Sequence, residues 1–380
     1  MLYRKMKNTP IKLSILGFGC MRFPLTGSGQ IDEPLATEMI RYAVDQGVNY
    51  IDTAYPYHNG ESEPFVGRAL ADGYRERVNL ATKLPSWLIK SRGDMDRYLD
   101  EQLIRLQTDH IDFYLLHGLV QPYWENLVNL GVTEFLDEAL ADGRIRFAGF
   151  SFHDTVKVFK EIVKAYDWTF TQIQYNFMDE HYQAGTTGLR YAARKGLGIV
   201  IMEPIRGGLL SKEIPGISEI WQKAPVSRTP SEWALRWVWD RPEVTVVLSG
   251  MSSLEQVREN LAYAEDGMPN SLTKKELSLF KKVKKEFNKR IPIPCTGCNY
   301  CMPCPYGVSI PECFEYYNRG HMYDDKEQTR QIYTAFLGGF PDDTPSYASL
   351  CQECGECEEK CPQGLPIREN LKKVVAYLGK

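Results

Sequence analysis

The 380-residue chain has the composition of an average soluble protein, with 43% hydrophobic residues, 25% charged residues and a net charge of −4. This composition excludes a disordered or collagen-like chain, and the near-neutral charge gives no electrostatic basis for binding nucleic acid. The length exceeds the roughly 250 residues of one barrel-type domain, so we expect one such domain and a smaller module.

The first segment, residues 1–20, lacks the continuous apolar stretch and the small-residue cleavage site of a signal peptide. No apolar run in the chain reaches the roughly 18 residues that a membrane span needs. We therefore expect a cytoplasmic protein that binds neither membranes nor nucleic acid.

From about residue 14 to residue 261, short apolar runs alternate with amphipathic helical patterns. In residues 94–106, for example, Met95, Leu99 and Leu103 recur at helical spacing. Glycines stand where helices should stop before the next strand, at Gly47, Gly73, Gly143 and Gly196. The runs that indicate short buried strands are Leu13–Gly19, Tyr50–Ala54, Val78–Lys83, Ile111–Leu116, Ile145–Ser151, Thr171–Asn176, Gly198–Met202 and Val244–Ser249.

Eight such strands alternating with helices predict a parallel sheet, and the number eight favours a closed (β/α)8 TIM barrel over an open doubly wound sheet. Active sites of these barrels lie at the C-terminal ends of the strands. Polar residues at those ends are therefore the first candidates for function.

After the barrel, residues 272–289 show a lysine-rich amphipathic helix whose charged face we expect to be solvated. The stretch Ile291–Pro294 ends it. We expect three parts: a barrel domain over residues 1–270, a helical linker over 271–294 and a small, mainly helical ferredoxin-like domain over 295–380. Within that last part, residues 308–349 should form helices joined by loops.

The cysteines are concentrated at the C-terminal end, where nine of ten follow residue 290 and only Cys20 precedes it. Tight C-x-x-C clusters without a secretion signal indicate metal rather than disulfides. The later run has the spacing C-x2-C-x2-C-x3-C-P of bacterial ferredoxins, and the earlier run differs by a last gap of two residues. The two runs are Cys295, Cys298, Cys301 and Cys304, and Cys351, Cys354, Cys357 and Cys361.

In two-cluster ferredoxins the fourth cysteine of each run binds the other cluster. We therefore expect two [4Fe–4S] clusters, although one cluster, structural zinc or buried free thiols remain alternatives. Cys313 and Cys20 lie outside these runs and are expected to pack as ordinary buried thiols. The expected ligand sets are Cys295, Cys298, Cys301 and Cys361 for one cluster, and Cys351, Cys354, Cys357 and Cys304 for the other.

Four polar residues stand at or just after predicted strand ends: Asp52, Tyr57, Lys83 and His117. Together they form a usable proton-transfer set, although each one alone has an ordinary structural explanation. A Lys83 ammonium would lower the pKa of Tyr57 from its usual value near 10, and Asp52 would hold Lys83 in place. His117 could orient a substrate oxygen, so the set suits protonation of a carbonyl oxygen while hydride reaches the carbon.

With these motifs the sequence resembles the aldo-keto reductase family over roughly residues 3–265. The resemblance implies a nicotinamide-dependent carbonyl reductase, with Tyr57 as general acid tuned by Lys83 and Asp52, and with His117 orienting the carbonyl. The residues that carry it are Asp52–Tyr57, Ser62, Glu63, Gly67, Ala69, Leu70, Lys83, His117, Gly149–Ser151, Gln172, Tyr175, Asn176, Pro204, Gly207, Gly208, Gly250, Glu259 and Asn260.

The resemblance also implies a nucleotide site, in which Ser151 and Gln172 hold the nicotinamide carboxamide. Many members stack a tyrosine on the nicotinamide where this sequence has Met202, and members that prefer NADPH have a basic residue where it has Gln256. The choice between NADP and NAD therefore stays open. The expected cofactor-binding residues are Ser151, Gln172, Met202, Pro204, Gly250, Ser252, Gln256, Glu259 and Asn260.

A subgroup of the family carries a ferredoxin-like tail, and this sequence is similar to that subgroup. Our first hypothesis is a reductase of an aldehyde, ketone or quinone that exchanges electrons through its clusters with a ferredoxin-like or flavin partner. The alternatives are a carbonyl reductase with purely structural clusters, and an electron-transfer or binding module without turnover. Tryptophans at Trp87, Trp124 and Trp221 suggest either an apolar pocket wall or packing between domains.

Overall fold

The computed structural model describes residues 1–339 and 344–380, which form two compact units. The first unit contains residues 1–207 and 231–273, and the second contains residues 208–230 and 274–380. The segment 208–230 thus belongs with the C-terminal unit, although it interrupts the first unit in sequence. Within the described residues, none of the helices combines the length and hydropathy needed to cross a membrane.

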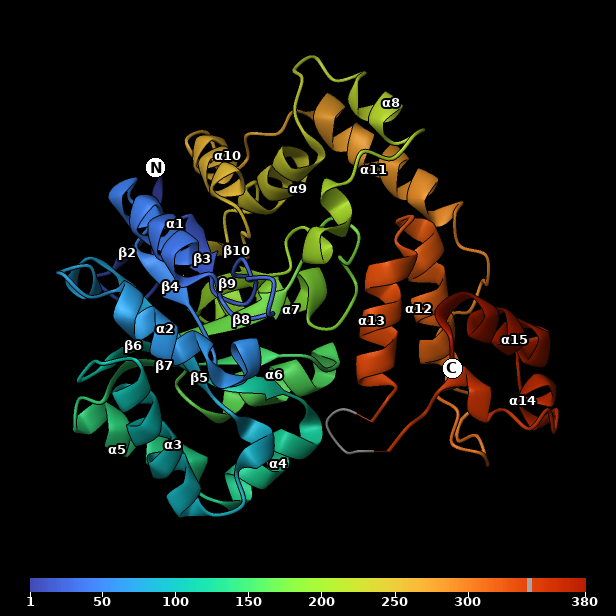
Figure 1. The fold of residues 1–380 in the computed structure, drawn as a ribbon, viewed down its shortest axis with the longest axis horizontal. Helices are drawn as coiled ribbons and strands as arrows, with labels where there is room; N and C mark the ends of the chain where they lie inside the picture. The colour runs from blue at the N-terminus through green and yellow to red at the C-terminus, as the bar shows by residue number, and fades with distance from the viewer. Residues whose placement is uncertain (340–343) are drawn as a thin grey trace. The chain divides into compact units, whose positions relative to one another are not determined.

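The first unit is a closed barrel of parallel strands, which confirms the expected (β/α)8 fold (Figure 1). Each of the eight predicted runs contributes one barrel strand. The strands are β3 (Leu16–Gly19), β4 (Tyr50–Asp52), β5 (Asn79–Leu84), β6 (Ile111–Leu119), β7 (Ile145–Phe152), β8 (Phe170–Gln174), β9 (Gly198–Met202) and β10 (Val246–Ser249).

Helices cover the outside of the barrel, and the predicted helix over residues 94–106 is α3. Each of the four helix-stopping glycines has a positive φ between 81° and 96°. This is the left-handed backbone conformation in which α-helices commonly end, and glycine adopts it without strain. The helices of this unit are α1 (Glu33–Asp45), α2 (Ser62–Ala69), α3 (Arg92–Arg105), α4 (Gln121–Asn129), α5 (Val132–Ala141), α6 (Val156–Ala165), α7 (Gly185–Arg194), α9 (Pro230–Trp239) and α10 (Leu254–Ala264).

An antiparallel hairpin precedes the barrel and corrects the prediction of one continuous strand over Leu13–Gly19. Its strands are β1 (Tyr3–Lys5) and β2 (Lys12–Ser14), so the run divides between β2 and β3. Hydrophobicity could not reveal this division, because Leu13 is as fully buried as Leu16 and Phe18 of β3.

The barrel interior is filled by an apolar cluster that determines where the polar site begins. Side chains alternate along a strand, so the residue two positions after a cluster member faces the same interior. Several of the residues two positions after cluster members, towards the C-terminal ends of the strands, are polar or contain sulfur: Asp52, Lys83, His117, Gln172 and Met202. The cluster consists of Met6, Leu13, Tyr50, Ala81, Phe113, Leu115, Phe170, Val200, Val246 and Leu248.

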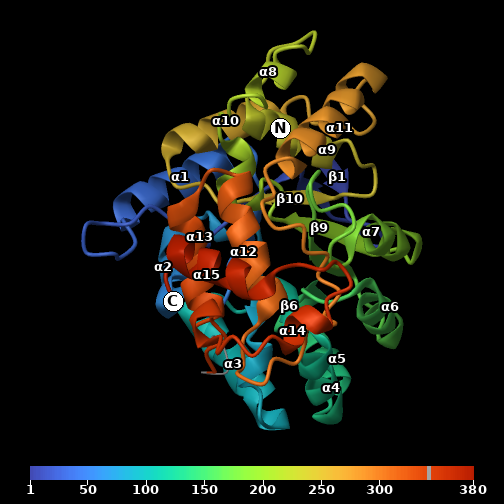
Figure 2. The ribbon, with the colours of Figure 1, turned by 90° about the vertical axis from the view of Figure 1, so that its right-hand side faces the viewer.

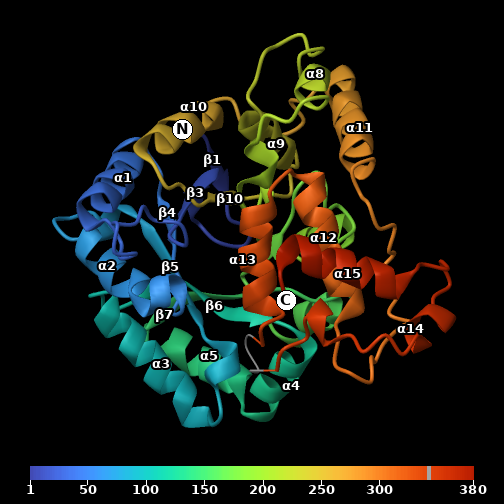
Figure 3. The same cartoon turned by 45° about the vertical axis from the view of Figure 1, so that its right-hand side comes forward.

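The second unit is mainly helical, and its core lies among α12, α13 and α15 (Figure 2). Helix α8 lies beside α11 (Figure 3). Trp221 of α8 packs there against Phe280 of α11, with ring centroids 4.9 Å apart. Helices joined by loops were expected over residues 308–349, and α12 and α13 confirm this; residues 340–343 lie outside the described residues. The lysine-rich helix expected over residues 272–289 is α11. The helices are α8 (Ser218–Trp221), α11 (Lys274–Asn288), α12 (Ile310–Met322), α13 (Lys326–Phe336), α14 (Glu356–Glu359) and α15 (Ile367–Leu378).

Candidate active site and iron–sulfur module

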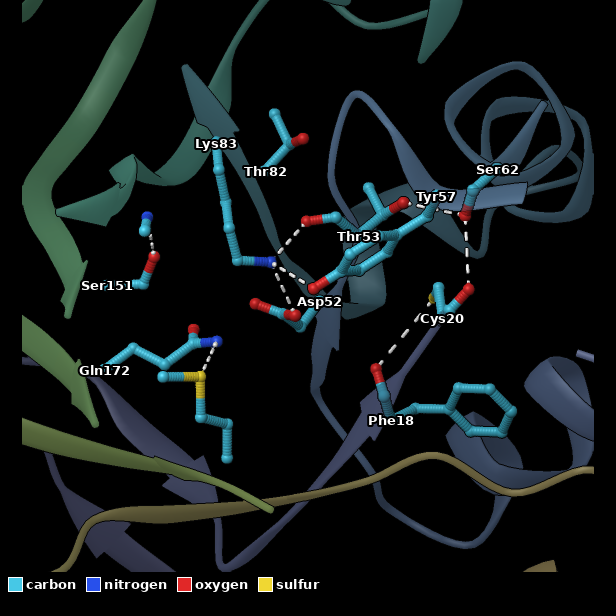
Figure 4. A network of polar contacts seen from close by, with 12 residues as sticks. Phe18, Cys20, Asp52, Thr53, Tyr57, Ser62, Thr82, Lys83, Ser151 and Gln172 are labelled. Carbon is cyan, nitrogen blue, oxygen red and sulfur yellow. Dashed lines mark hydrogen bonds and ion pairs between the residues drawn. The ribbon is translucent and has the colours of Figure 1, made fainter. Parts of the chain in front are cut away.

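Lys83 lies at the centre of a buried polar chain at the C-terminal end of the barrel (Figure 4). Its Nζ donates hydrogen bonds to Asp52 Oδ1 at 2.8 Å, to the Thr53 carbonyl at 2.7 Å and to Tyr57 Oη at 3.4 Å. The Lys83 and Asp52 side chains are only 1% and 3% exposed. Because a buried charge is tolerated only when it is paired, this arrangement holds the ammonium in one position.

A tight turn after β4 places Tyr57 over the barrel. The turn is η1 (Tyr57–Gly60), and within it His58 and Asn59 have φ values of 52° and 56°. Non-glycine residues rarely adopt this left-handed conformation unless the surroundings hold them there. His58 is held at Nε2, which accepts the Phe23 backbone N–H at 3.3 Å, and its ring stacks on Phe23.

Burial decides the protonation state of Tyr57. Burial raises its pKa above the ordinary value, and the Lys83 ammonium offsets only part of this effect. The net direction is therefore opposite to the expected lowering, and the phenol is protonated at neutral pH. For Lys83, burial lowers the pKa, but the attraction of Asp52 and Tyr57 outweighs it and keeps the amine charged.

Aromatic rings surround His117 on β6. The ring centroid of His117 lies 6.1 Å from that of Tyr57 and 5.1 Å from that of Trp87, in the turn after β5. Trp87 therefore lies against a candidate catalytic residue. Trp124 instead packs near Trp168, with centroids 6.2 Å apart, which is ordinary packing.

His117 is a neutral imidazole. Burial, followed by the Lys83 ammonium and then by His153, holds its pKa well below the ordinary value. Its Nδ1 is buried and has no hydrogen-bond partner in the part of the chain that the structure describes. A neutral imidazole donates from one ring nitrogen, as orientation of a carbonyl oxygen requires.

Ser151 and Gln172 lie on the neighbouring strands β7 and β8 (Figure 4). Ser151 Oγ accepts the Gly118 backbone N–H at 2.7 Å, and Gln172 Nε2 lies 3.8 Å from Met202 Sδ. Gln172 Oε1 is buried and finds no partner among the described residues. This free carbonyl fits the amide N–H of a nicotinamide carboxamide, so the structure brings three of the expected cofactor residues together at the interior.

The remaining expected cofactor residues follow β9 and β10. Pro204 is buried, whereas Gly250, Ser252 and Glu259 are exposed. The Asn260 side chain is buried, where it donates to the Ser249 hydroxyl at 2.9 Å. The exposed Gln256 accepts the Ser252 backbone N–H at 2.9 Å through Oε1. The structure thus gives Asn260 a structural hydrogen bond and leaves the loop after β10 open to a ligand.

Two pockets in the second unit are lined by cysteines, and all ten cysteines of the chain are free thiols. Ile310 lines both pockets and gives them a shared apolar wall. One pocket is lined by Cys295, Cys298, Cys301 and Cys361, and the other by Cys304, Cys351, Cys354 and Cys357, with Cys301 lining both.

This grouping takes each fourth cysteine from the opposite run, as the expected ligand sets do. A cubane cluster uses one thiolate per iron, so its ligands surround a volume instead of converging on one ion. Within residues 1–339 and 344–380, no group of three histidine, cysteine or acidic side chains could hold a single metal ion. Because the cysteines line a volume in this way, the two pockets fit [4Fe–4S] clusters.

Two known families match this chain. Residues 15–284 match the aldo/keto reductase family. The chain belongs to that family. Residues 294–366 match the 4Fe-4S dicluster domain, so the chain combines an aldo/keto reductase barrel with a 4Fe–4S domain.

Two curated relatives and one solved structure match this aldo/keto reductase along most of their own length. An NADH-specific methylglyoxal reductase of Escherichia coli is 28% identical over 302 residues, covering 67% of this chain and 90% of the relative. An L-galactose dehydrogenase of Arabidopsis thaliana is 28% identical over 284 residues, covering 68% and 86%. The holo form of AKR11C1, an aldo-keto reductase from Bacillus halodurans, has a TM-score of 0.63 at 28% identity, covering 74% and 96%.

The sequence did not reveal two neighbours of the candidate catalytic side chains. The Thr53 backbone carbonyl binds Lys83, and no side-chain pattern reports a carbonyl. His153 lies two positions after Ser151, so the period of two along β7 could have identified it as facing the same side.

Proposed function

We propose that this aldo/keto reductase reduces the carbonyl group of an aldehyde, ketone or quinone with NADH or NADPH, using Tyr57 as general acid. The observation that supports this proposal is the buried chain from Asp52 through Lys83 to the Tyr57 hydroxyl. The chain ends at a protonated phenol beside a neutral imidazole, which is the combination that protonation of a carbonyl oxygen needs.

The protein's part in the reaction is to hold the carbonyl and deliver a proton. Reduced nicotinamide, when bound, supplies the hydride. His117 donates a hydrogen bond to the substrate oxygen, and Tyr57 transfers its phenolic proton to that oxygen as negative charge develops there. Lys83 stabilises the resulting phenolate, and Asp52 keeps Lys83 charged and in position.

Nucleotide binding would involve Gln172, whose free Oε1 accepts from the carboxamide, while Met202 packs nearby. Gln256 is uncharged and already bonded to Ser252, so it offers no ion pair to a 2′-phosphate. One relative is named as NADH-specific. We therefore expect NADH to be accepted at least as well as NADPH.

Replacement of the general acid tests this mechanism. We expect Tyr57→Phe to lower kcat by about 100-fold or more, because the proton donor is lost, while nucleotide binding persists. The matched control is Tyr55→Phe, since the Tyr55 hydroxyl bonds Glu101 at 3.2 Å instead of Lys83. A kcat for Tyr57→Phe equal to that of the wild type would contradict the proposed mechanism.

We further propose that the module holds two [4Fe–4S] clusters that exchange electrons with a ferredoxin-like or flavin partner. A bound [4Fe–4S] cluster takes up and releases single electrons. Each pocket includes one cysteine that is exposed at the surface, Cys298 in one and Cys354 in the other. This exposure supports electron exchange with a partner, because the partner could approach each cluster closely.

Oxygen-free purification followed by iron and sulfide counts, which we expect to be about eight each, tests the number of clusters. NADH and NADPH are then added separately, with paramagnetic resonance reporting the clusters and absorbance reporting the nicotinamide. Cluster reduction by either nucleotide supports electron transfer. Clusters that stay oxidised while added carbonyls consume nicotinamide would favour a structural role.

A further inference from the structure

His153, which the mechanism above does not use, lies at the mouth of the barrel beside His117. It directly follows the end of β7, and alternation places it on the face that carries Ser151. Its backbone N–H donates to the Leu119 carbonyl at 3.0 Å, which ties it to β6, the strand of His117. A Cβ added at Gly118 would lie 3.9 Å from His153 Cδ2, so the ring stands directly against this strand.

His153 is an exposed residue, yet its ring is oriented by a neighbour. Gln183 Nε2 lies 3.3 Å from His153 Nδ1. An amide N–H only donates, so Nδ1 accepts and the ring hydrogen lies on Nε2. Gln183 has a φ of 52°, a conformation that side-chain-bearing residues adopt only when their surroundings hold them.

Two imidazoles thus lie at the same end of the barrel, His117 on β6 and His153 directly after β7. Leu119 of β6 pairs with Phe152 of β7, so His153 lies just beyond the level of His117. Because neighbouring strands are only about 4.8 Å apart, donors at these two strand ends can serve two oxygens of one small molecule. His117 is assigned to the reacting carbonyl. Among the described residues the Nε2–H of His153 has no hydrogen-bond partner, so this donor is available to a second oxygen of the substrate.

We propose that His153 is a specificity-determining residue that donates a hydrogen bond to an oxygen on the carbon adjacent to the reacting carbonyl. The preferred substrates are then α-dicarbonyls, α-hydroxycarbonyls and ortho-quinones. This inference rests on the proposed reductase function, because it takes the position of the reacting carbonyl from Tyr57 and His117.

The test compares butane-2,3-dione with butan-2-one in the full-length, cluster-loaded enzyme. Loss of one hydrogen bond in His153→Phe should lower kcat/KM for the dione about 3- to 10-fold, mainly through KM, and leave the ketone unchanged. His153→Gln keeps an N–H donor and should recover part of the loss. The control is His181→Phe, which replaces an exposed histidine and should change kcat/KM for neither compound. Equal losses for both compounds, or none for either, would overturn the inference.

Calorimetric titration of the same compounds separates this inference from the proposed function, because it needs no turnover. If the wild type reduces neither compound but His153→Phe still weakens dione binding selectively, the second-oxygen site stands and the reductase function fails. If turnover persists without selective weakening, the inference about His153 fails alone. If neither turnover nor selective binding is found, both fail.

Discussion

Among single residues, Lys83 has the most consequences for its neighbours. It is almost fully buried, and its charge is compensated chiefly by Asp52. Removal of one partner from such a pair leaves an uncompensated charge in the barrel. Lys83 also partly offsets the burial that raises the pKa of Tyr57. The stability of the fold and the pKa of Tyr57 thus both depend on the ammonium group of Lys83.

Lys83→Met should therefore have two separable effects. Unfolding experiments should show a loss of about 3–5 kcal/mol, because Asp52 is left buried without its counter-charge. The double variant Asp52→Asn/Lys83→Met should recover part of that loss. The pKa of Tyr57 should rise further, so the alkaline limb of the pH–rate profile should move to higher pH. An unmoved limb would show that Lys83 does not tune Tyr57.

His117 should make stability depend on acid pH. Its pKa lies well below the ordinary value, chiefly because of burial. Below about pH 6.5 the unfolded chain binds a proton at this residue and the folded chain does not, which lowers the unfolding free energy by about 1.4 kcal/mol per pH unit. His117→Gln should remove this contribution. Denaturant titrations between pH 7 and pH 5 measure it, and parallel curves for both proteins would contradict the assignment.

At the scale of elements, the position of α2 depends on a glycine that contacts α3. A Cβ at Gly67 would lie 2.8 Å from the Arg105 carbonyl oxygen and 2.8 Å from the Leu106 carbonyl carbon. Backbone atoms yield little, so this contact requires a residue without a side chain. The helix that follows the Tyr57 turn therefore packs directly on the helix that follows Lys83.

Gly67→Ala should consequently destabilise the protein by about 1–3 kcal/mol. Gly93→Ala is the matched control, because Gly93 lies in α3 and an added Cβ would meet nothing within 4 Å. Alanine has the higher helix propensity, so this control should be neutral or stabilising by up to about 1 kcal/mol. Thermal unfolding of both variants measures the difference. Similar melting temperatures would contradict the prediction and would show that α2 can shift away from α3 to accommodate the added methyl group.

At the scale of the whole molecule, the two cysteine-lined pockets depend on each other, because each takes cysteines from both runs. Each pocket needs the fourth cysteine of the other run. We expect Cys361→Ser and Cys304→Ser each to lose about half of the iron, because the other set of four stays complete. Cys313→Ser is the control, since Cys313 is buried and lines neither pocket. Iron counts and paramagnetic resonance distinguish this result from loss of all iron in either variant.

The sequence predicted much of the architecture because the signals involved are local. Apolar runs of strand length identified each barrel strand, and glycines such as Gly47 marked helix ends that need a positive φ. Cysteine spacing alone identified the 4Fe–4S domain. Strand ends then pointed to Asp52 and Lys83, which the structure joins at 2.8 Å.

Contacts between distant residues decided the rest. The division of the first apolar run between β2 and β3 depends on strand pairing, and the raised pKa of Tyr57 depends on burial by the assembled barrel. The orientation of His153 depends on Gln183, 30 positions away. By itself the sequence determined which elements form and which residues can do chemistry, because these follow from neighbouring residues. Only the tertiary structure decided protonation states, side-chain orientation and partners, because burial and hydrogen bonding arise when remote segments meet.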